Sequence, residues 1–540
     1  MAVTAILALL GGAGVWSLIA LHINVATLVD SYTNAVSFAR RIWPLEFPSA
    51  AEVAREVGTT LSIVLLATLL SVILSIPLAV AAAANTKRTQ LGRTCARSLI
   101  VASRVVPDVV LAIVFVRLFG LGVLPGVLAM GLHSVGMVAK LYADAIEHVD
   151  PGPQESLRAT GAGRRQQLVT SVFPLVAPSF LAIALHRFDI NLRISAILGF
   201  VGVAGVGMKM SEAFGRLNFS LGVAWALVLF VLCVLVEWLS ASMRRGLLRN
   251  ASGTEDHPSR IVGARRRRLG DTVERGDGLR CRVSPPWTAR RVRRHLYGAA
   301  FLGFVLWALL GSGVLDGELH GGLSGFLATL DHFWPPGSGG SFDDLVEALG
   351  TTIQIGLAAT LCGAVIAIPL GSLAARNVAP NRAVFVACRG VILAVRATPE
   401  LVLAIMLVVS IGLGPVAGTL ALAIGSAGLL GKLVADSVEE VDPGPGEALR
   451  TVGASRLQVY TGATLPQALA AIVSNGLYQL DVNIRAATLL GIVGGGGIGY
   501  FLLQATRTRE YEIVTLILFM TFAVVMVVEL AAMGLRRLLR

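Results

Sequence analysis

Charged side chains recur at one fixed spacing inside two stretches of the chain that are otherwise apolar. The two sets are Asp189, Asn191 and Arg193, and Asp481, Asn483 and Arg485. An aspartate and an arginine four residues apart share one face of a helix, and the asparagine between them points elsewhere. Because the planar donors of arginine match the geometry of an oxyanion, one interpretation is that both arginines contribute positive potential to a pathway for an oxyanion.

The alternative interpretation is an ion pair that neutralises itself and only fixes helix packing. A charge at membrane depth is costly, so it usually faces either a partner or an aqueous path. Arg104 with Asp108, and Arg396 with Glu400, repeat the spacing. We expect these pairs near the cytosolic end of the third span, where long side chains are more often interfacial anchors than ligands. Both arginines remain candidates for the pathway.

The composition of the chain indicates which elements must position these residues. The chain has 540 residues, of which 55% are hydrophobic and 14% are charged, and its mean hydropathy is +0.75. Stretches 59–84, 99–119 and 513–528 carry few or no charges, and about 20 apolar residues span a bilayer as a helix. In lipid the backbone must satisfy its own hydrogen bonds, so runs of this length indicate helices. The prediction is an all-α polytopic membrane protein.

Several other classes of site are not indicated. Residues 1–20 lack a basic start and a clear cleavage site, so we expect a retained first helix. The five cysteines form no Cys-x-x-Cys pair, which predicts free thiols. The glycine run 494–497 lacks the Lys-Ser/Thr of a phosphate-binding loop, and no cluster has metal-ligand spacing. We therefore expect no enzyme activity, metal or cofactor in this chain.

The net charge of +12 is concentrated in one segment. Residues 244–294 hold 15 arginines, no lysine and 5 acidic residues. The positive-inside rule explains this segment as a cytosolic linker in contact with anionic lipid, and no folded basic module suggests nucleic acid. By the same rule, segment 86–97 faces the cytosol. Segment 315–347, which has six acidic residues and no lysine or arginine, faces outside.

The chain repeats itself. "TTLSIVLLATLLSVILSIPL" begins at residue 59 and "TTIQIGLAATLCGAVIAIPL" at residue 351, an offset of 292. The same offset aligns Arg104 with Arg396, Pro107 with Pro399, Asp189 with Asp481 and Glu237 with Glu529. We predict two copies of one membrane domain, 1–245 and 295–540, joined by a basic linker, 246–294, with about six spans in each domain. An even number of spans before the linker makes the repeats parallel, with a pathway between the halves and both termini in the cytosol.

A polar stretch follows the fourth span of each repeat. It reads "ESLRATGAGRRQQLVTSVFP" at 155–174 and "EALRTVGASRLQVYTGATLP" at 447–466. Asp150-Pro151 and Asp442-Pro443 predict the start of a short helix, with Asp as cap and Pro at its first position. Gly161 and Gly453 are predicted to end that helix. Pro174 and Pro466 are predicted to mark entry into the next span.

These stretches resemble the EAA loop of ABC-importer permeases, in which Glu-Ala-Ala is followed by Gly and later by Leu-Pro. The matching residues are Glu155, Ser156, Gly161 and Pro174 in the first copy, and Glu447, Ala448, Gly453 and Pro466 in the second. Both copies depart from the pattern, since leucine replaces the second alanine and Ser156 replaces the first alanine in one copy. The resemblance implies that each loop forms a coupling helix that docks into a cytosolic ATPase subunit.

The wider match resembles the permeases of phosphonate/phosphate-type ABC importers. It is carried by "KLVADSVEEVDPGPGEALRTVGAS" (432–455), "LYQLDVNIRAATLLGIVGGGGIG" (477–499) and "RATPELVLAIM" (396–406). Members usually pair two separate chains, whereas this sequence fuses two copies. The resemblance implies two partner ATPases that carry ATP and Mg, an extracytoplasmic solute-binding protein, a phosphorus oxyanion as substrate and the bacterial cytoplasmic membrane as location.

Two other functions stay open from the residues alone. A secondary transporter of anions built from parallel repeats would need no docking loop, and it would transport without any partner. A membrane-embedded enzyme would need a catalytic set of residues that the sequence does not offer.

Overall fold

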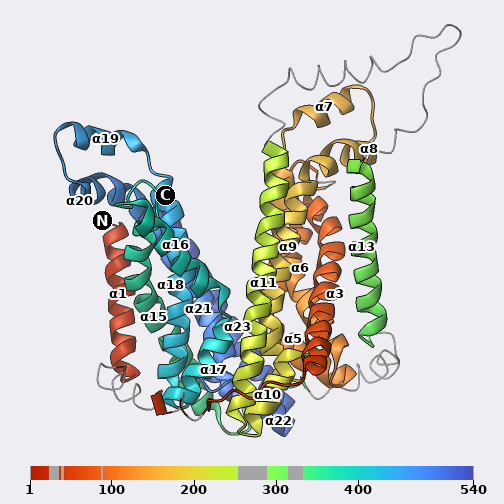
Figure 1. Cartoon of the computed structure of the whole chain (residues 1–540), viewed down its shortest axis with the longest axis vertical. Helices are drawn as coiled ribbons and strands as arrows, with labels where there is room; N and C mark the ends of the chain where they lie inside the picture. The colour runs from red at the N-terminus through yellow and green to blue at the C-terminus, as the bar shows by residue number, and fades with distance from the viewer. Residues whose placement is uncertain are drawn as a thin grey trace, which may run out of the picture.

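The computed structural model of the chain describes residues 2–23, 36–37, 40, 42–86, 89–252, 289–313 and 333–538. These residues form two helical bundles that meet at one end and separate toward the other (Figure 1). The loop helices α7 (Gly152–Ala159) and α19 (Pro443–Thr451) lie at the separated end, and both ends of the chain lie on that side. Most of the predicted linker, residues 253–288, lies outside the described residues. The part of the acidic segment 315–347 that comes before residue 333 also lies outside them.

The order of the helices repeats along the chain. The first repeat contains α1 (Ala2–Ala20), α3 (Ala50–Ala82), α4 (Gln90–Val105), α5 (Asp108–Phe119), α6 (Val123–Glu147), α7, α8 (Arg164–Gln167), α9 (Phe173–Gly199), α10 (Val206–Gly215) and α11 (Phe219–Ser252). The second contains α13 (Ala289–Gly311), α15 (Phe342–Leu373), α16 (Arg382–Ala397), α17 (Glu400–Ile411), α18 (Pro415–Glu439), α19, α20 (Arg456–Val459), α21 (Leu465–Gly491), α22 (Ile498–Thr508) and α23 (Tyr511–Leu538). The α11 and α13 helices extend into the predicted linker from its two ends.

The helices confirm the all-α membrane fold. Among the described residues, seven helices are long and apolar enough to cross a bilayer, and nine if each bent pair counts as one span. The bent pairs are α4 with α5 and α16 with α17. Two shorter apolar helices, α1 and α13, begin the repeats, and α21 is the repeat counterpart of α9. Each repeat therefore has six corresponding helices or bent pairs.

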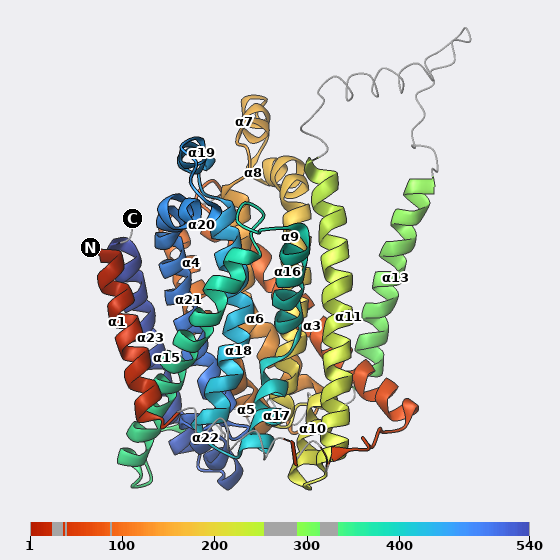
Figure 2. The same cartoon turned by 60° about the vertical axis from the view of Figure 1, so that its left-hand side comes forward.

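The first helix of each repeat packs against the other repeat. In the two views, α1 runs beside α15, and α13 runs beside α3 (Figures 1 and 2). Ile6 of α1 belongs to a buried cluster with Val473 and Leu477 of α21. On the other bundle, a Cβ added to Gly58 would lie 3.3 Å from the Trp307 ring of α13. The division at 1–245 and 295–540 thus marks the sequence repeats, while each packed bundle contains one helix from the other repeat.

The third span of each repeat is broken in the middle, which differs from the continuous run expected at 99–119. The α4 and α5 helices meet at 82°, and α16 and α17 meet at 80°. A residue before proline is pushed out of the helical region, and Val106, before Pro107, has φ −74° and ψ 116°. The same break occurs at Thr398, before Pro399. Proline therefore ends each helix and redirects the chain.

This break corrects the expected position of Arg104 and Arg396. Both lie in the last turn of their helices, α4 and α16, far from the loop end where these helices begin. Arg104 and Asp108 belong to two helices on either side of Pro107, so they share no helical face. The expected pair at four-residue spacing does not form there among the described ion pairs. Both arginines are partly buried, and Arg104 lines a pocket together with residues of the second repeat.

The fifth span begins earlier than its proline suggested. A single helical passage runs from Arg164 to Gly199, and Pro174 lies within it. A π-helical turn at Leu168–Val172 comes directly before the proline, and Tyr460–Thr464 forms the same turn before Pro466. Because a proline ring clashes with the carbonyl four residues back in a regular α-helix, the wider turn makes room for it. Pro174 and Pro466 therefore lie in the first turn of α9 and α21, as predicted, while the helical passage of the first repeat already starts at Arg164.

The glycine run forms a turn, and the expectation of free thiols is confirmed for the described cysteines. Gly494, Gly496 and Gly497 adopt φ values of 93°, 82° and 79° and form the turn between α21 and α22. Among the described residues, Cys95, Cys233, Cys362 and Cys388 are free thiols. Cys281 lies outside the described residues.

Candidate functional site

The two loop helices end in the same way. After α7, Gly161 has φ +80°, its N–H donates to the Arg158 carbonyl at 3.0 Å, and the next N–H reaches the Leu157 carbonyl at 3.1 Å. After α19, Gly453 has φ +82°, and the corresponding bonds to Arg450 and Leu449 measure 3.0 and 3.1 Å. This is the left-handed glycine cap that closes many helices. The two glycines therefore end their helices as predicted.

The starts of the two loop helices differ slightly. Asp442 caps α19, and its carboxylate accepts the N–H of Gly444 at 2.9 Å, with Pro443 as the first helical residue. Asp150 accepts the N–H of Gly152 at 3.0 Å, but α7 begins one residue later, at Gly152. The predicted start is confirmed for α19 and is displaced by one residue for α7.

Both loop helices are at the surface. No residue of α7 or α19 is buried, and the side chains of Glu155, Ser156, Glu447 and Ala448 are all exposed. The second loop also exposes apolar side chains, because Val452 is 78% and Leu457 is 71% exposed. The first repeat has Thr160 and Arg165 at these two positions. The two helices lie on one side of the molecule (Figure 2), so one layer of partner protein could reach both.

The charged sets in the fifth spans form the ion pairs of the alternative interpretation. Arg193 Nη2 lies 3.1 Å from Asp189 Oδ2, and Arg485 pairs with Asp481 in the same way. Arg193 also lies 2.9 Å from Glu237 Oε2 on α11. Within the described residues, the equivalent pair between Arg485 and Glu529 is not formed. The two repeats therefore place identical residue types in different electrostatic arrangements.

The two asparagines lie inside the bundles. Asn191 donates from Nδ2 to Thr68 Oγ1 at 3.1 Å and accepts from Ser134 Oγ at 3.1 Å. Asn483, Thr360 and Ser426 repeat this network, with distances of 2.8 and 2.9 Å. Asn191 is 0% and Asn483 is 1% exposed. These residues tie together three helices of one bundle, and the paired threonines and serines could have been found from the repeat alignment alone.

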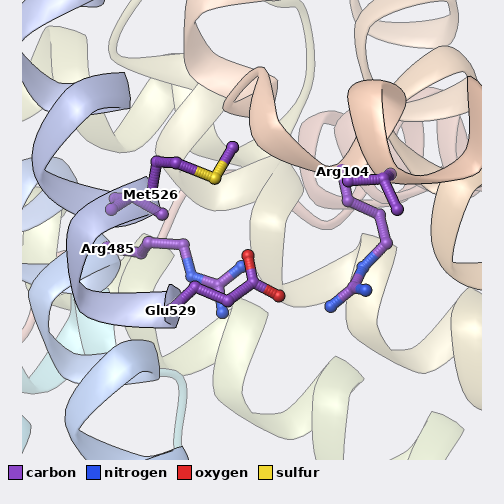
Figure 3. Close-up of a pocket in the computed structure, with 6 residues that line it drawn as sticks. Arg104, Arg485, Met526 and Glu529 are labelled. Atoms are coloured by element: carbon purple, nitrogen blue, oxygen red, sulfur yellow. The ribbon is translucent and has the colours of Figure 1, made fainter. Parts of the chain in front are cut away.

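A small pocket lies where the bundles approach each other. Its lining consists of Val101, Arg104, Arg485, Val525, Met526 and Glu529. Arg104 comes from α4 of the first repeat, whereas Arg485 and Glu529 come from α21 and α23 of the second. In Figure 3, the Glu529 carboxylate lies beside the Arg485 guanidinium, and Arg104 points toward them from the opposite side. The sequence had not singled out Glu529, although its alignment with Glu237 was the available signal.

The remaining candidate, Arg396, is the repeat counterpart of Arg104 and lies in the last turn of α16. On its side of the interface, the α17 helix packs against the first repeat, because Leu401, Val402 and Ile405 share a buried cluster with Trp225 and Leu229 of α11. The structure thus brings Arg104 together with Arg485 in one pocket. Arg396 does not line the pocket that Arg104 and Arg485 share.

Comparisons with known proteins agree with this architecture. The family model described as "Binding-protein-dependent transport system inner membrane component" matches residues 75–249 and again 367–540. The phosphate-import permease protein PhnE of Mycolicibacterium smegmatis is 38% identical over 502 residues, covering 93% of this chain and 88% of that protein. The phosphite transport system permease protein PtxC of Stutzerimonas stutzeri is 36% identical and covers 41% of this chain and 81% of its own length.

Among solved structures, an inward-facing form of the MetNI methionine ABC transporter covers 38% of this chain and 100% of the matched chain, at 22% identity and a TM-score of 0.35. The duplicated family match coincides with the structural repeat, and the phosphate-import relative is similar over nearly the whole length. The chain is therefore a multi-pass membrane protein of the binding-protein-dependent transport system inner membrane component family, with two permease domains fused in one chain.

Proposed function

We propose that this chain forms the transmembrane pathway of an ATP-driven importer that moves phosphate, phosphonate or a related phosphorus oxyanion into the cytosol. The observation that carries the proposal is the pair of loop helices, α7 and α19. Both end in the same glycine cap, and both lie on one side of the molecule. Each would dock one ATPase subunit, and those subunits would bind ATP and Mg. A solute-binding protein on the other side would deliver the substrate.

The exposed residues support docking of a partner. Glu155 and Glu447 occupy equivalent exposed positions, so neither contributes to the core of this chain. Val452 and Leu457 expose apolar surface directly after α19. Exposed apolar side chains rimmed by polar residues are typical of protein interfaces. A loop that only connected two spans would not need this geometry twice.

The names of the relatives and the chemistry of the interface support the proposed substrate class. Two relatives are named for the import of phosphate and of phosphite. Arg104 and Arg485 approach each other across the interface between the repeats. Arginine pairs bind phosphorus oxyanions well, because their donors match two oxygens at once. We propose that the pathway passes between the two bundles, beside these arginines.

The direct test is transport by the reconstituted complex. The chain is purified with its co-purifying subunits, placed in proteoliposomes with the solute-binding protein, and assayed for uptake of radiolabelled phosphate with and without ATP. Unlabelled phosphonate and phosphite compete in parallel samples. The proposal expects uptake that requires ATP and both partners. Uptake by this chain alone, driven by an ion gradient, would instead identify a secondary transporter.

Stoichiometry gives an independent test. Because both permease domains are fused, native mass spectrometry should find one copy of this chain with two ATPase subunits. Two copies of this chain in each complex would contradict the proposal that its two halves form one pathway.

A further inference from the structure

The two repeats can be compared position by position, and three of the positions at which they differ carry polar or charged side chains near the interface. His133, Asp108 and Arg187 of the first repeat align with Gly425, Glu400 and Gln479 of the second. The surrounding polar network is the same in both repeats. The differences therefore show which groups the fold itself does not need.

Arg187 is the most unusual of these groups. It is 3% exposed, its Nε donates to Ser134 Oγ at 2.7 Å, and its Nη1 lies 3.8 Å from the Met137 sulfur. Its Nη2 has no hydrogen-bond partner among the described residues. A buried guanidinium with an unused donor is costly, and such sites are associated with ligand or substrate paths.

Gln479 shows that a neutral residue can do the structural work at this position. Its Nε2 donates to Ser426 Oγ at 3.0 Å and to Asn483 Oδ1 at 3.0 Å. The network of Asn483, Ser426 and Thr360 is complete without a positive charge. The charge of Arg187 therefore serves something other than the packing of α6 against α9.

His133 links this charge to the interface pocket. A carbonyl oxygen only accepts, so His133 Nδ1 donates to the Val106 carbonyl, at 2.9 Å, at the break between α4 and α5. The ring interacts electrostatically with Asp108, with Arg187 and, across the interface, with Arg485. In the second repeat the histidine is replaced by Gly425, and a Cβ there would lie 2.8 Å from Glu400 Oε1. The longer carboxylate fills the space of the missing ring.

The two sides of the interface consequently differ in charge. One side gathers Arg104, Arg187, Arg485 and His133 with Asp108, Asp481 and Glu529. The equivalent positions hold Arg396 and Arg193 with Glu400, Asp189 and Glu237. On that second side Arg193 is already paired with two carboxylates. The first side therefore has one more arginine and an arginine that is less completely neutralised.

We propose that the oxyanion is bound on one side of the interface only, between Arg104 and Arg485, and that Arg187 supplies the positive charge that selects this side. This inference rests on the proposed function and specifies which side of the pathway contacts the substrate. Fusion of the two domains into one chain makes such asymmetry possible, because each half can then change independently.

The first test replaces Arg187 by the residue that stands at its counterpart in the second repeat. Arg187→Gln should keep the polar network, since Gln479 already forms it, and should lower ATP-driven phosphate uptake about tenfold at saturating binding protein. Arg187→Lys should retain most of the uptake, because it keeps the charge. ATPase activity in detergent and assembly with the ATPases report whether the variants are intact.

A matched pair on the two sides completes the test. Arg104→Gln should reduce uptake strongly, whereas Arg396→Gln should reduce it less than about twofold. Equal losses for these two variants, or unchanged uptake by Arg187→Gln, would overturn the one-sided site. Failure of the proposed function itself looks different, because the unmodified complex would then show no ATP-dependent phosphate uptake.

Discussion

Arg193 binds Glu237 at 2.9 Å, which ties the fifth span of the first repeat to its last span. The equivalent residues of the second repeat, Arg485 and Glu529, stand beside each other in the interface pocket without forming that ion pair. The same residue types thus form an ion pair in one repeat, whereas the corresponding pair is not formed in the other repeat. Four predictions separate structural from functional roles at these and related positions.

The first prediction concerns the two arginines. Arg193→Gln removes the ion-pair partner that Asp189 and Glu237 share, and the side chains of these two residues are 5% and 10% exposed. Losing one partner of a buried pair costs about 3 kcal/mol. Arg193→Gln should therefore lower the thermal stability of the purified chain more than Arg485→Gln does.

The double variant Asp481→Asn with Arg485→Gln removes both partners, so it should assemble with the ATPases but transport poorly. Thermal unfolding and phosphate uptake are measured on the same preparations. Near-normal uptake by this double variant would show that the Asp481–Arg485 pair has only a structural role.

The second prediction concerns the glycine caps. Gly161→Val with Gly453→Val forces a branched side chain into left-handed backbone, at a cost of about 1–2 kcal/mol at each position. The loops lie outside the apolar spans, so the amount of protein in the membrane should not change, whereas ATP-driven uptake should fall at least about tenfold. The matched control is Gly215→Ala, where an added Cβ meets nothing within 4 Å. Normal uptake by the double variant would contradict the docking role of these loops.

The third prediction concerns the apolar surface after α19. Val452→Asp places a charge on a side chain that is 78% exposed, so the fold should tolerate it. If the surface contacts an ATPase, the variant should co-purify with fewer ATPase subunits, because the charge would be desolvated on docking. Thr160→Asp, at the equivalent and already polar position of the first repeat, should have the smaller effect. Subunit ratios from native mass spectrometry decide between these outcomes.

The fourth prediction concerns the asparagines. Asn483→Ala leaves Thr360 and Ser426 without their shared partner, which should cost about 2 kcal/mol of stability. Uptake per folded molecule should stay within about twofold of the unmodified protein, since the amide faces the inside of its own bundle. The Asn191→Ala variant should behave in the same way. A large loss of transport at unchanged thermal stability would instead support the pathway interpretation of these residues.

The amino-acid sequence by itself determined the class of protein, the repeat and the loops. Long apolar runs can satisfy their backbone only as helices in lipid, so 59–84 and 513–528 specified spans. The offset of 292 aligned Gly161 with Gly453, and glycine is the residue that tolerates the left-handed cap each loop requires. These are local requirements, so short segments of the sequence are enough to predict them.

Only the tertiary structure decided which charged residues of the two repeats lie close to one another. Whether Arg193 reaches Glu237, 44 residues away, depends on how α9 packs against α11. Whether Arg104 meets Arg485 depends on the approach of two repeats and on a break at Pro107 that a hydropathy run does not reveal. The packing of α1 and of α13 against the other repeat was likewise decided only by the tertiary structure. An apolar helix can bury its face against any complementary neighbour, and the hydrophobic effect, which has no direction, does not specify which one.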